Sequence, residues 1–200
     1  MPRIRGGSIE KHHELVWADL ADATRRLLLE RDYDSINMGH IAAEAGIARN
    51  TLYNYARDKA ALVQALTERA SRPMLERVTT IAASTEEPAA DRMHQIVEAV
   101  FEASTDQALQ PMFRPGAGPL IDELPKGPGG PFHAIMAEVE NVVRAGITRA
   151  EFRDIPDVPL TVELLAGAMR AGAERIGRDP ATYKPTVRAT QQLIQAALTR

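Results

Sequence analysis

The chain contains no cysteine, which excludes disulfide bonds, thiolate metal sites and a cysteine nucleophile. It also lacks any long apolar run, and its longest apolar stretches are far shorter than a membrane span. The basic residues between Met1 and Gly7 are not followed by an apolar core, so we expect no signal peptide. These absences predict a cytoplasmic protein that makes no contact with a membrane.

Recognisable catalytic motifs are missing as well. There is no G-x-S-x-G elbow and no Walker loop, and residues 116–118 lack the further glycine and the preceding strand of a dinucleotide fingerprint. His12, His13 and Glu14 are metal-binding residue types, but their spacing is not that of H-E-x-x-H, and a solvated helix start explains them better. We therefore expect no enzyme activity, no cofactor and no metal site.

Alanine is abundant and apolar residues recur at helical spacing, whereas aromatic residues make up only 4% of the chain. No strand-length run of alternating β-branched residues appears, so we predict an all-α protein in one or two domains. Pro73 is expected to kink or break one of the helices. Longer helices are predicted over about residues 10–31, 59–83, 88–101, 131–143, 160–176 and 185–198.

Residues 37–59 carry the most informative pattern. Asn37 is placed to cap a short helix that Gly46 ends in a left-handed conformation, and Ile47 returns to the core. The next helix is barely two turns long and crowds polar side chains together from Arg49 to Tyr55. A buried helix would not be built this way. The pattern fits a helix that lies in the major groove of DNA with its first residues at the base edges.

The stretch from about Leu15 to Leu66 resembles the DNA-binding domain of the TetR family of transcriptional regulators. The motifs that carry the resemblance are Tyr33, Ile41-Ala42, Ala45-Gly46-Ile47, Thr51-Leu52-Tyr53, Tyr55 and Lys59. The chain departs from the family pattern at Leu28, Asp32, Ala48 and Ala56. The resemblance implies a flexible basic arm at 1–11, a helix-turn-helix domain at 12–66, and a larger helical domain for effector binding and dimerisation at 67–200.

Side-chain chemistry suggests how these residues meet DNA. Arg49 and Asn50 suit guanine and adenine edges, and Thr51 suits a thymine methyl group or a phosphate. The resemblance supports phosphate contacts from the hydroxyls of Tyr53 and Tyr55. The full set of expected DNA-binding residues is Arg3, Arg5, Asn37, Arg49, Asn50, Thr51, Tyr53, Asn54, Tyr55 and Lys59.

Charge is balanced, which is unusual for a protein that only coats DNA. The net charge is −3, and residues 1–70 hold ten basic and ten acidic side chains. We therefore expect a focused basic surface, with acidic residues such as Asp19, Asp22 and Glu30 facing away from it.

Residues 111–131 interrupt the helical pattern, because eleven of these twenty-one residues are proline or glycine. The segment is either a loose surface loop or the wall of a cavity, and one short turn is expected at 120–124. Gly146 and residues 151–159 are expected to break the chain again.

Apolar residues beyond position 90 suggest a pocket for a hydrophobic or amphipathic ligand of unknown identity. The alternative for each of them is ordinary core packing. The resemblance favours a pocket, because TetR-like regulators commonly bind a small molecule in this part of the chain. The candidates are Met93, Phe101, Met112, Phe113, Phe132 and Met136.

The last two helices are rich in small and aliphatic residues. They pack either within the chain or across a two-fold axis as half of a four-helix bundle. The resemblance favours a homodimer, which would place two recognition helices about 34–36 Å apart on a palindrome. The expected interface residues are Leu164, Leu165, Ala168, Met169, Gly172, Ile176, Leu193, Ile194 and Leu198.

These features together predict a dimeric repressor that binds a palindromic operator in double-stranded DNA and is released by a small-molecule effector. The alternative is an all-helical carrier or enzyme in which the helix-turn-helix is only structural. Selective retention of a palindromic DNA fragment separates the two.

Overall fold

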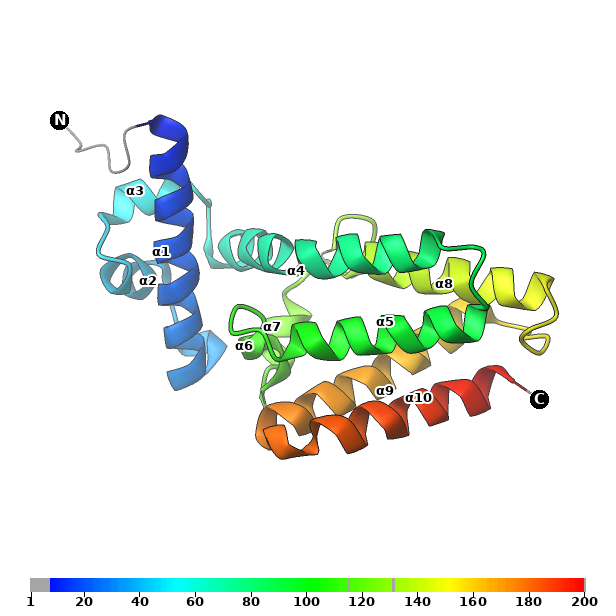
Figure 1. Cartoon of the computed structure of the whole chain (residues 1–200). Helices are drawn as coiled ribbons and strands as arrows, with labels where there is room; N and C mark the ends of the chain where they lie inside the picture. Colours follow the sequence, from blue (N-terminus) through cyan, green and yellow to red (C-terminus); the bar gives the residue numbers. More distant parts are fainter. Residues whose placement is uncertain (1–7, 115, 131, 200) are drawn as a thin grey trace.

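The computed structural model describes residues 8–114, 116–130 and 132–199, and this part of the chain is helical without a β-strand (Figure 1). The all-α prediction is confirmed. The N-terminal elements are α1 (Ile9–Glu30), η1 (Tyr33–Ser35), α2 (Met38–Glu44), α3 (Arg49–Tyr53) and α4 (Lys59–Ala83). The remaining elements are α5 (Ala89–Ser104), α6 (Gln110–Phe113), α7 (Gly118–Asp122), α8 (His133–Thr148), α9 (Val158–Arg178), η2 (Pro180–Thr182) and α10 (Tyr183–Leu198).

The first hydrophobic core joins α1, α2, α3 and the start of α4. Leu20 and Leu27 lie seven residues, or about two turns, apart on α1, so they point into the same core. Ile41 of α2, Leu52 of α3 and Leu62 of α4 are fully buried against them. Because α3 is only five residues long, it holds its position through Leu52 rather than through helical propensity.

The second core is a bundle of α5, α8, α9, α10 and the second half of α4. Phe101 is completely buried at its centre, and the backbone of Gly172 approaches it so closely that an added Cβ would lie 2.7 Å from the ring. Gly146 has the same role against Phe152, at 2.3 Å. The expected break at Gly146 is therefore wrong, because α8 continues to Thr148 and uses the glycine for close packing.

Helix α4 belongs to both cores. Leu62 and Val63 lie in the first core, and Met74, Val78 and Ile81 lie in the second. Asp58 caps the helix by accepting a hydrogen bond from the backbone N–H of Ala61 at 2.7 Å, as expected. Of the kink or break predicted at Pro73, the break is absent, because α4 runs through Pro73 as one helix. The proposed domain boundary at 66/67 thus falls inside a continuous helix.

The described residues of the segment, 111–114 and 116–130, pack as the wall of a cavity rather than as a loose loop. Met112, Leu120 and Leu124 are buried and extend the first core. Phe113 packs against both cores. In Figure 1, α6 and α7 accordingly lie between α1 and the bundle.

Candidate functional site

The turn between α2 and α3 is fixed by hydrogen bonds that the sequence predicts. The side chain of Asn37 accepts from the backbone N–H of His40 at 3.0 Å, which caps α2. At the other end Gly46 has a φ of +66°, and the N–H of Ile47 donates to the carbonyl of Ala42 at 3.0 Å. This ending of α2 lets the chain turn sharply into α3, because glycine adopts the left-handed conformation without strain.

Helix α3 presents a polar face to solvent. Leu52 is fully buried, whereas Arg49, Asn50, Tyr53 and Asn54 are exposed and Thr51 is half-buried. Ala48 stands at the N-cap without a side-chain hydrogen bond, so an N–H group at the start of α3 lacks the partner that a serine would supply. The arrangement leaves the side chains suited to base edges on the outer surface.

Arg49 and Tyr53 form a pair on this surface. The Nη2 group of Arg49 donates to the hydroxyl of Tyr53 at 3.3 Å, and its guanidinium carbon lies 5.8 Å from the centre of the ring. Residues four apart on a helix face the same side. The contact therefore restrains the flexible Arg49 side chain beside the Tyr53 hydroxyl. The hydroxyl oxygen accepts in this contact, so its O–H group can still donate to another partner.

Tyr55 is held more firmly than Tyr53. It is half-buried, and its ring lies 5.3 Å from the ring of Trp17 in an edge-on arrangement and 5.4 Å from the ring of His13. Burial raises the pKa of Tyr55, so its hydroxyl is a neutral donor at physiological pH. A neutral phenol anchored by aromatic contacts is suited to donate to a phosphate oxygen.

Lys59 is engaged inside the protein. Its Nζ donates to the backbone carbonyl of Tyr33 at 2.7 Å and lies 3.7 Å from the centre of the Tyr33 ring. The expectation that its charge is offered to phosphate does not fit these contacts. Lys59 instead ties η1 to the start of α4. Arg57 remains exposed, 3.2 Å from Asp58.

Two other expectations concern the N-terminal region. Arg3 and Arg5 lie outside the described residues. Asp19 and Asp22 line a pocket between α1, α4 and the α5–α6 region, and no residue of α3 lines that pocket. Asp22 is paired with Arg25 at 3.4 Å and with Arg26 at 3.8 Å.

A cavity of about 560 Å³ opens within the bundle, and we call it the effector pocket. Its lining is predominantly apolar, and its charged residues are Glu163 and Arg170 of α9. Five of the six expected ligand-binding residues line it: Met93, Met112, Phe113, Phe132 and Met136. The size and lining are those of a site for a small organic molecule.

Comparison with known proteins agrees with this architecture. Residues 20–66 match the model of the bacterial regulatory proteins of the tetR family. This helix-turn-helix segment therefore belongs to the tetR family of bacterial regulatory proteins. Two Mycobacterium tuberculosis proteins, from strains CDC 1551 and H37Rv, are each 32% identical over 111 residues and are named uncharacterized HTH-type transcriptional regulators. The match covers 56% of this chain and 55% of each relative, so it spans only about half the length of these relatives.

Solved structures of transcriptional regulators share the fold over most of the chain. A protein of Shewanella sp. PV-4 has a TM-score of 0.72 at 17% identity, covering 92% of this chain and 98% of that one. FadR from Bacillus subtilis, solved with stearoyl-CoA, has a TM-score of 0.71 at 16% identity, with 91% and 97% covered. SmeT, a repressor of a Stenotrophomonas maltophilia efflux pump, has a TM-score of 0.70 at 15% identity, covering 92% of this chain and 90% of that one. The first two of these proteins are named as transcription regulators and SmeT as a repressor.

Within this TetR-family fold, two of the sequence predictions need correction. Phe101 does not line the effector pocket, because it fills the core beside Gly172. Six expected interface residues are instead buried in the core of the same chain: Leu165, Met169, Gly172, Ile176, Ile194 and Leu198. Leu164 and Leu193 are exposed and Ala168 is half-buried.

The sequence reasoning missed Leu160, which is 51% exposed and lies one helical turn before Leu164. The signal was its four-residue spacing from Leu164. Residues 8–114, 116–130 and 132–199 contain no group of three metal-binding side chains and no helix with the length and apolar character needed to cross a membrane.

Proposed function

We propose that this TetR-family protein is a transcriptional repressor that binds a palindromic operator as a homodimer. The observation that carries the proposal is the exposed polar face of α3, where Arg49, Asn50 and Tyr53 project from a helix fixed by the buried Leu52. Base-edge readout needs such side chains on a helix narrow enough to enter the major groove. Operator binding places the protein in the cytoplasm, with the DNA it regulates.

Phosphate contacts complete the proposed interface. Tyr53 and Tyr55 offer hydroxyl donors, and Asn37, Thr51 and Asn54 offer short polar groups around them. Since Lys59 is held by Tyr33, the start of α4 acts through its backbone N–H groups and the helix dipole. Few lysine and arginine side chains take part, so we expect a modest dependence of operator affinity on salt.

Operator selection tests the proposal. The protein should retain a palindromic fragment of its own upstream DNA from a mixture of genomic fragments. Arg49→Ala should weaken binding by about 1–3 kcal/mol and relax one base position in each half-site. Arg72→Ala removes the same charge from an exposed site on α4 and serves as the control. Unchanged affinity and selectivity in Arg49→Ala would remove α3 from the interface.

The exposed stripe on α9 and α10 supports the homodimer. Leu160, Leu164 and Leu193 are 51%, 67% and 54% exposed, although leucine side chains stabilise a fold mainly when they are buried. Leu160 and Leu164 are one turn apart on α9, and α10 packs beside α9. Two such helix pairs facing each other across a two-fold axis bury the stripe.

Sedimentation equilibrium tests this interface. The double variant Leu164→Asp/Leu193→Asp should sediment as a monomer at a micromolar concentration at which the unmodified protein is a dimer. Leu15→Asp makes the same change at a 40% exposed leucine on α1, far from the stripe, and should remain a dimer. A monomeric unmodified protein would contradict the proposed assembly.

The effector pocket supports release by a hydrophobic or amphipathic molecule. Met74 of α4 lines the pocket, and Leu62 of the same helix anchors the first core. Twelve residues at about 1.5 Å each separate them by about 18 Å. A ligand that prefers a different position of α4 therefore changes the position of the helix-turn-helix. Stearoyl-CoA in FadR and triclosan in a SmeT complex are ligands of fold relatives with apolar parts.

Fluorescent 1-anilinonaphthalene-8-sulfonate is a suitable probe of the pocket. Its fluorescence should rise on binding, and operator affinity measured by anisotropy should fall in parallel. Val139→Trp fills part of the pocket from α8 and should abolish the fluorescence change. An unaltered operator affinity across a broad ligand screen would instead favour a constitutive DNA binder.

A further inference from the structure

The effector pocket opens to solvent along a single helix. Among the described residues that line it, those outside α9 are buried or half-buried. The exposed lining residues all belong to α9, and they are Leu160, Glu163, Leu164 and Arg170. At about 3.6 residues per turn these positions share one face of the helix. The mouth of the pocket therefore lies beside this face, which we call the outer face of α9.

The outer face of α9 is also part of the proposed homodimer interface. Leu160 and Leu164 line the pocket and belong to the exposed stripe on α9 and α10. A Cβ added to Gly167 would have no contact within 4 Å, so the surface between Leu164 and Arg170 leaves room for a partner. A second copy that covers the stripe therefore also covers the mouth of the pocket.

Glu163 and Arg170 have complementary charges for a two-fold arrangement of this face. They are separated by about 10 Å along α9. Neither side chain forms a hydrogen bond or an ion pair with another described residue. When two copies of α9 cross antiparallel with the two-fold axis near Gly167, Glu163 of each copy lies opposite Arg170 of the other. The charges on the rim of the pocket thus favour a second copy of this chain as the molecule that covers it.

We propose that the partner subunit closes the effector pocket, so that the ligand site is complete only in the homodimer. The proposal rests on the homodimer of the proposed function and adds α9 of the second copy as a wall of the pocket. With the axis near Gly167, Leu164 of the partner subunit lies beside Arg170 and over the mouth. An apolar side chain in this place excludes water from the cavity and extends its apolar lining.

Closure by the partner couples ligand binding to assembly. A ligand enclosed by both subunits buries more apolar surface than a ligand in one subunit, so the dimer binds it more tightly. The coupling is reciprocal, and the dimer has two sites, so a tenfold gain in affinity at each site strengthens the dimer about a hundredfold at saturating ligand. The closed cavity of about 560 Å³ also favours a compact ligand over one with a bulky group that projects through the mouth.

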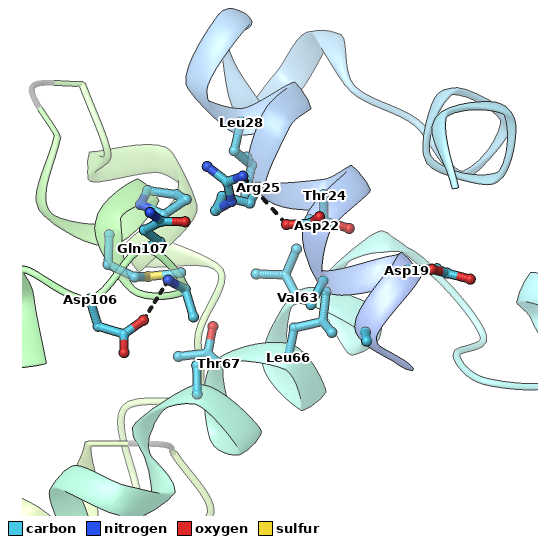
Figure 2. A pocket seen from close by; sticks show the side chains of 16 residues that line it. Asp19, Asp22, Thr24, Arg25, Leu28, Val63, Leu66, Thr67, Asp106 and Gln107 are labelled. Atoms are coloured by element: carbon cyan, nitrogen blue, oxygen red, sulfur yellow. Dashed lines mark hydrogen bonds and ion pairs between the residues drawn. The ribbon is translucent and has the colours of Figure 1, made fainter. Parts of the chain in front are cut away.

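A second cavity provides a comparison within the same molecule. It measures about 440 Å³ and lies between α1, the first half of α4 and residues 106–112 (Figure 2). None of its described lining residues belongs to α9 or α10, so a partner on the stripe leaves this cavity as open as it is in a single subunit. Leu66 of α4 lines this cavity and Met136 of α8 lines the effector pocket, and both side chains are half-buried.

Single cysteines measure the closure directly, because the chain has no cysteine of its own. Met136→Cys and Leu66→Cys place one thiol in each cavity, and the small neutral reagent 4,4′-dithiodipyridine reports how fast it is reached. Each is compared with and without Ala189→Asp/Leu193→Asp, which puts carboxylates on exposed positions of α10 that line neither cavity. We expect the thiol of Met136→Cys to react at least about tenfold faster in the resulting monomer than in the dimer. The thiol of Leu66→Cys should react at the same rate in both.

Charge reversal tests where the two copies of α9 cross. Glu163→Arg and Arg170→Glu each place like charges opposite one another across the axis. Since a symmetric dimer has two such contacts, each variant should raise the dimer Kd about five- to thirtyfold. The double variant restores opposite charges and should return the Kd to within about twofold of the unmodified protein. Additive weakening in the double variant would refute a crossing near Gly167.

Sedimentation equilibrium of the same samples separates failure of the closure from failure of the proposed homodimer. A dimer in which the thiol of Met136→Cys reacts as fast as in the monomer refutes the closure and leaves the homodimer intact. If Ala189→Asp/Leu193→Asp remains a dimer, the stripe is not the interface and the closure is refuted. If the unmodified protein is a monomer at micromolar concentration, the proposed homodimer fails and the closure fails with it.

Discussion

Arg92 of α5 tests how a buried guanidinium with unpaired donors affects the stability of the bundle. It is 1% exposed, and its Nη1 donates to the carbonyl of Ala82 at 2.9 Å, in the last turn of α4. Its Nε and Nη2 are buried without hydrogen-bond partners. A charged group at this depth is stabilising only when its donors are satisfied.

The magnitudes favour replacement by a residue of similar shape. Each buried donor without a partner costs about 1–3 kcal/mol, so the two cost about 2–6 kcal/mol. The charge-assisted bond to Ala82 returns about 1.5–3 kcal/mol, and the C-terminal dipole of α4 adds about 0.3–2 kcal/mol. Arg92→Met keeps most of the apolar stem and removes both orphan donors. We expect it to stabilise the fold by about 1 kcal/mol, which raises Tm by about 2–4 °C.

Arg92→Ala is the matched comparison, because it removes the stem as well and leaves a cavity. It should be about 2–4 kcal/mol less stable than Arg92→Met. Equilibrium urea unfolding at one fixed protein concentration measures both, because the stability of the proposed dimer depends on concentration. A loss of more than about 2 kcal/mol in Arg92→Met would refute the reasoning, and would show that Nε and Nη2 are bound to ordered water in the folded protein.

Three further substitutions test local features. Ala48→Ser should supply the missing cap of α3 and stabilise it by about 0.5–1 kcal/mol, visible as slower amide exchange in α3; unchanged exchange would contradict the cap argument. Ala150→Gly should gain about 0.5–1 kcal/mol in urea unfolding, because Ala150 holds a φ of +58° at the end of α8; a loss would show that the left-handed strain is absent. Burial raises the pKa of Tyr33 to about 12, with smaller contributions from neighbouring carboxylates that include Glu123. The raised value means that the stability from neutral Tyr33 is fully present below about pH 10 and is lost as pH rises through about 12. Tyr33→Phe also removes a buried hydroxyl without a partner, so it should be at least as stable at pH 7 and should lose about 2 kcal/mol less between pH 10 and 12; an unchanged alkaline loss would exclude Tyr33 as its source.

The helix-turn-helix was predictable because its signals are local. Asn37 and Asp58 cap helices within three residues of themselves, and Gly46 needs only its own backbone conformation to end α2. Such features are written into short stretches of sequence. The end of α8 could not be predicted in this way. Ala150, rather than a glycine, takes the left-handed position there, so the sequence carries no helix-ending glycine.

The interface and pocket residues depend on packing between distant segments. Helix α9 has small residues on several sides, such as Gly167, Ala168 and Gly172, so composition does not show which side meets the bundle. Gly172 faces Phe101, seventy-one positions earlier, and that contact decides the buried side. The contact between Lys59 and Tyr33 was not predictable for the same reason, because Tyr33 lies in η1.

The two cavities meet at a short helix, α6, whose local stability differs from that of the long helices around it. The long helices α4, α5, α8, α9 and α10 are held by a continuous core, and such a core resists small deformations. Helix α6 has four residues and no side-chain cap, and it lies where both cavities meet at Met112. Short, weakly stabilised segments adjust at the lowest free-energy cost. A ligand in the proposed effector pocket therefore acts first on α6, whereas α4, which belongs to both cores, carries the resulting displacement to the N-terminal domain.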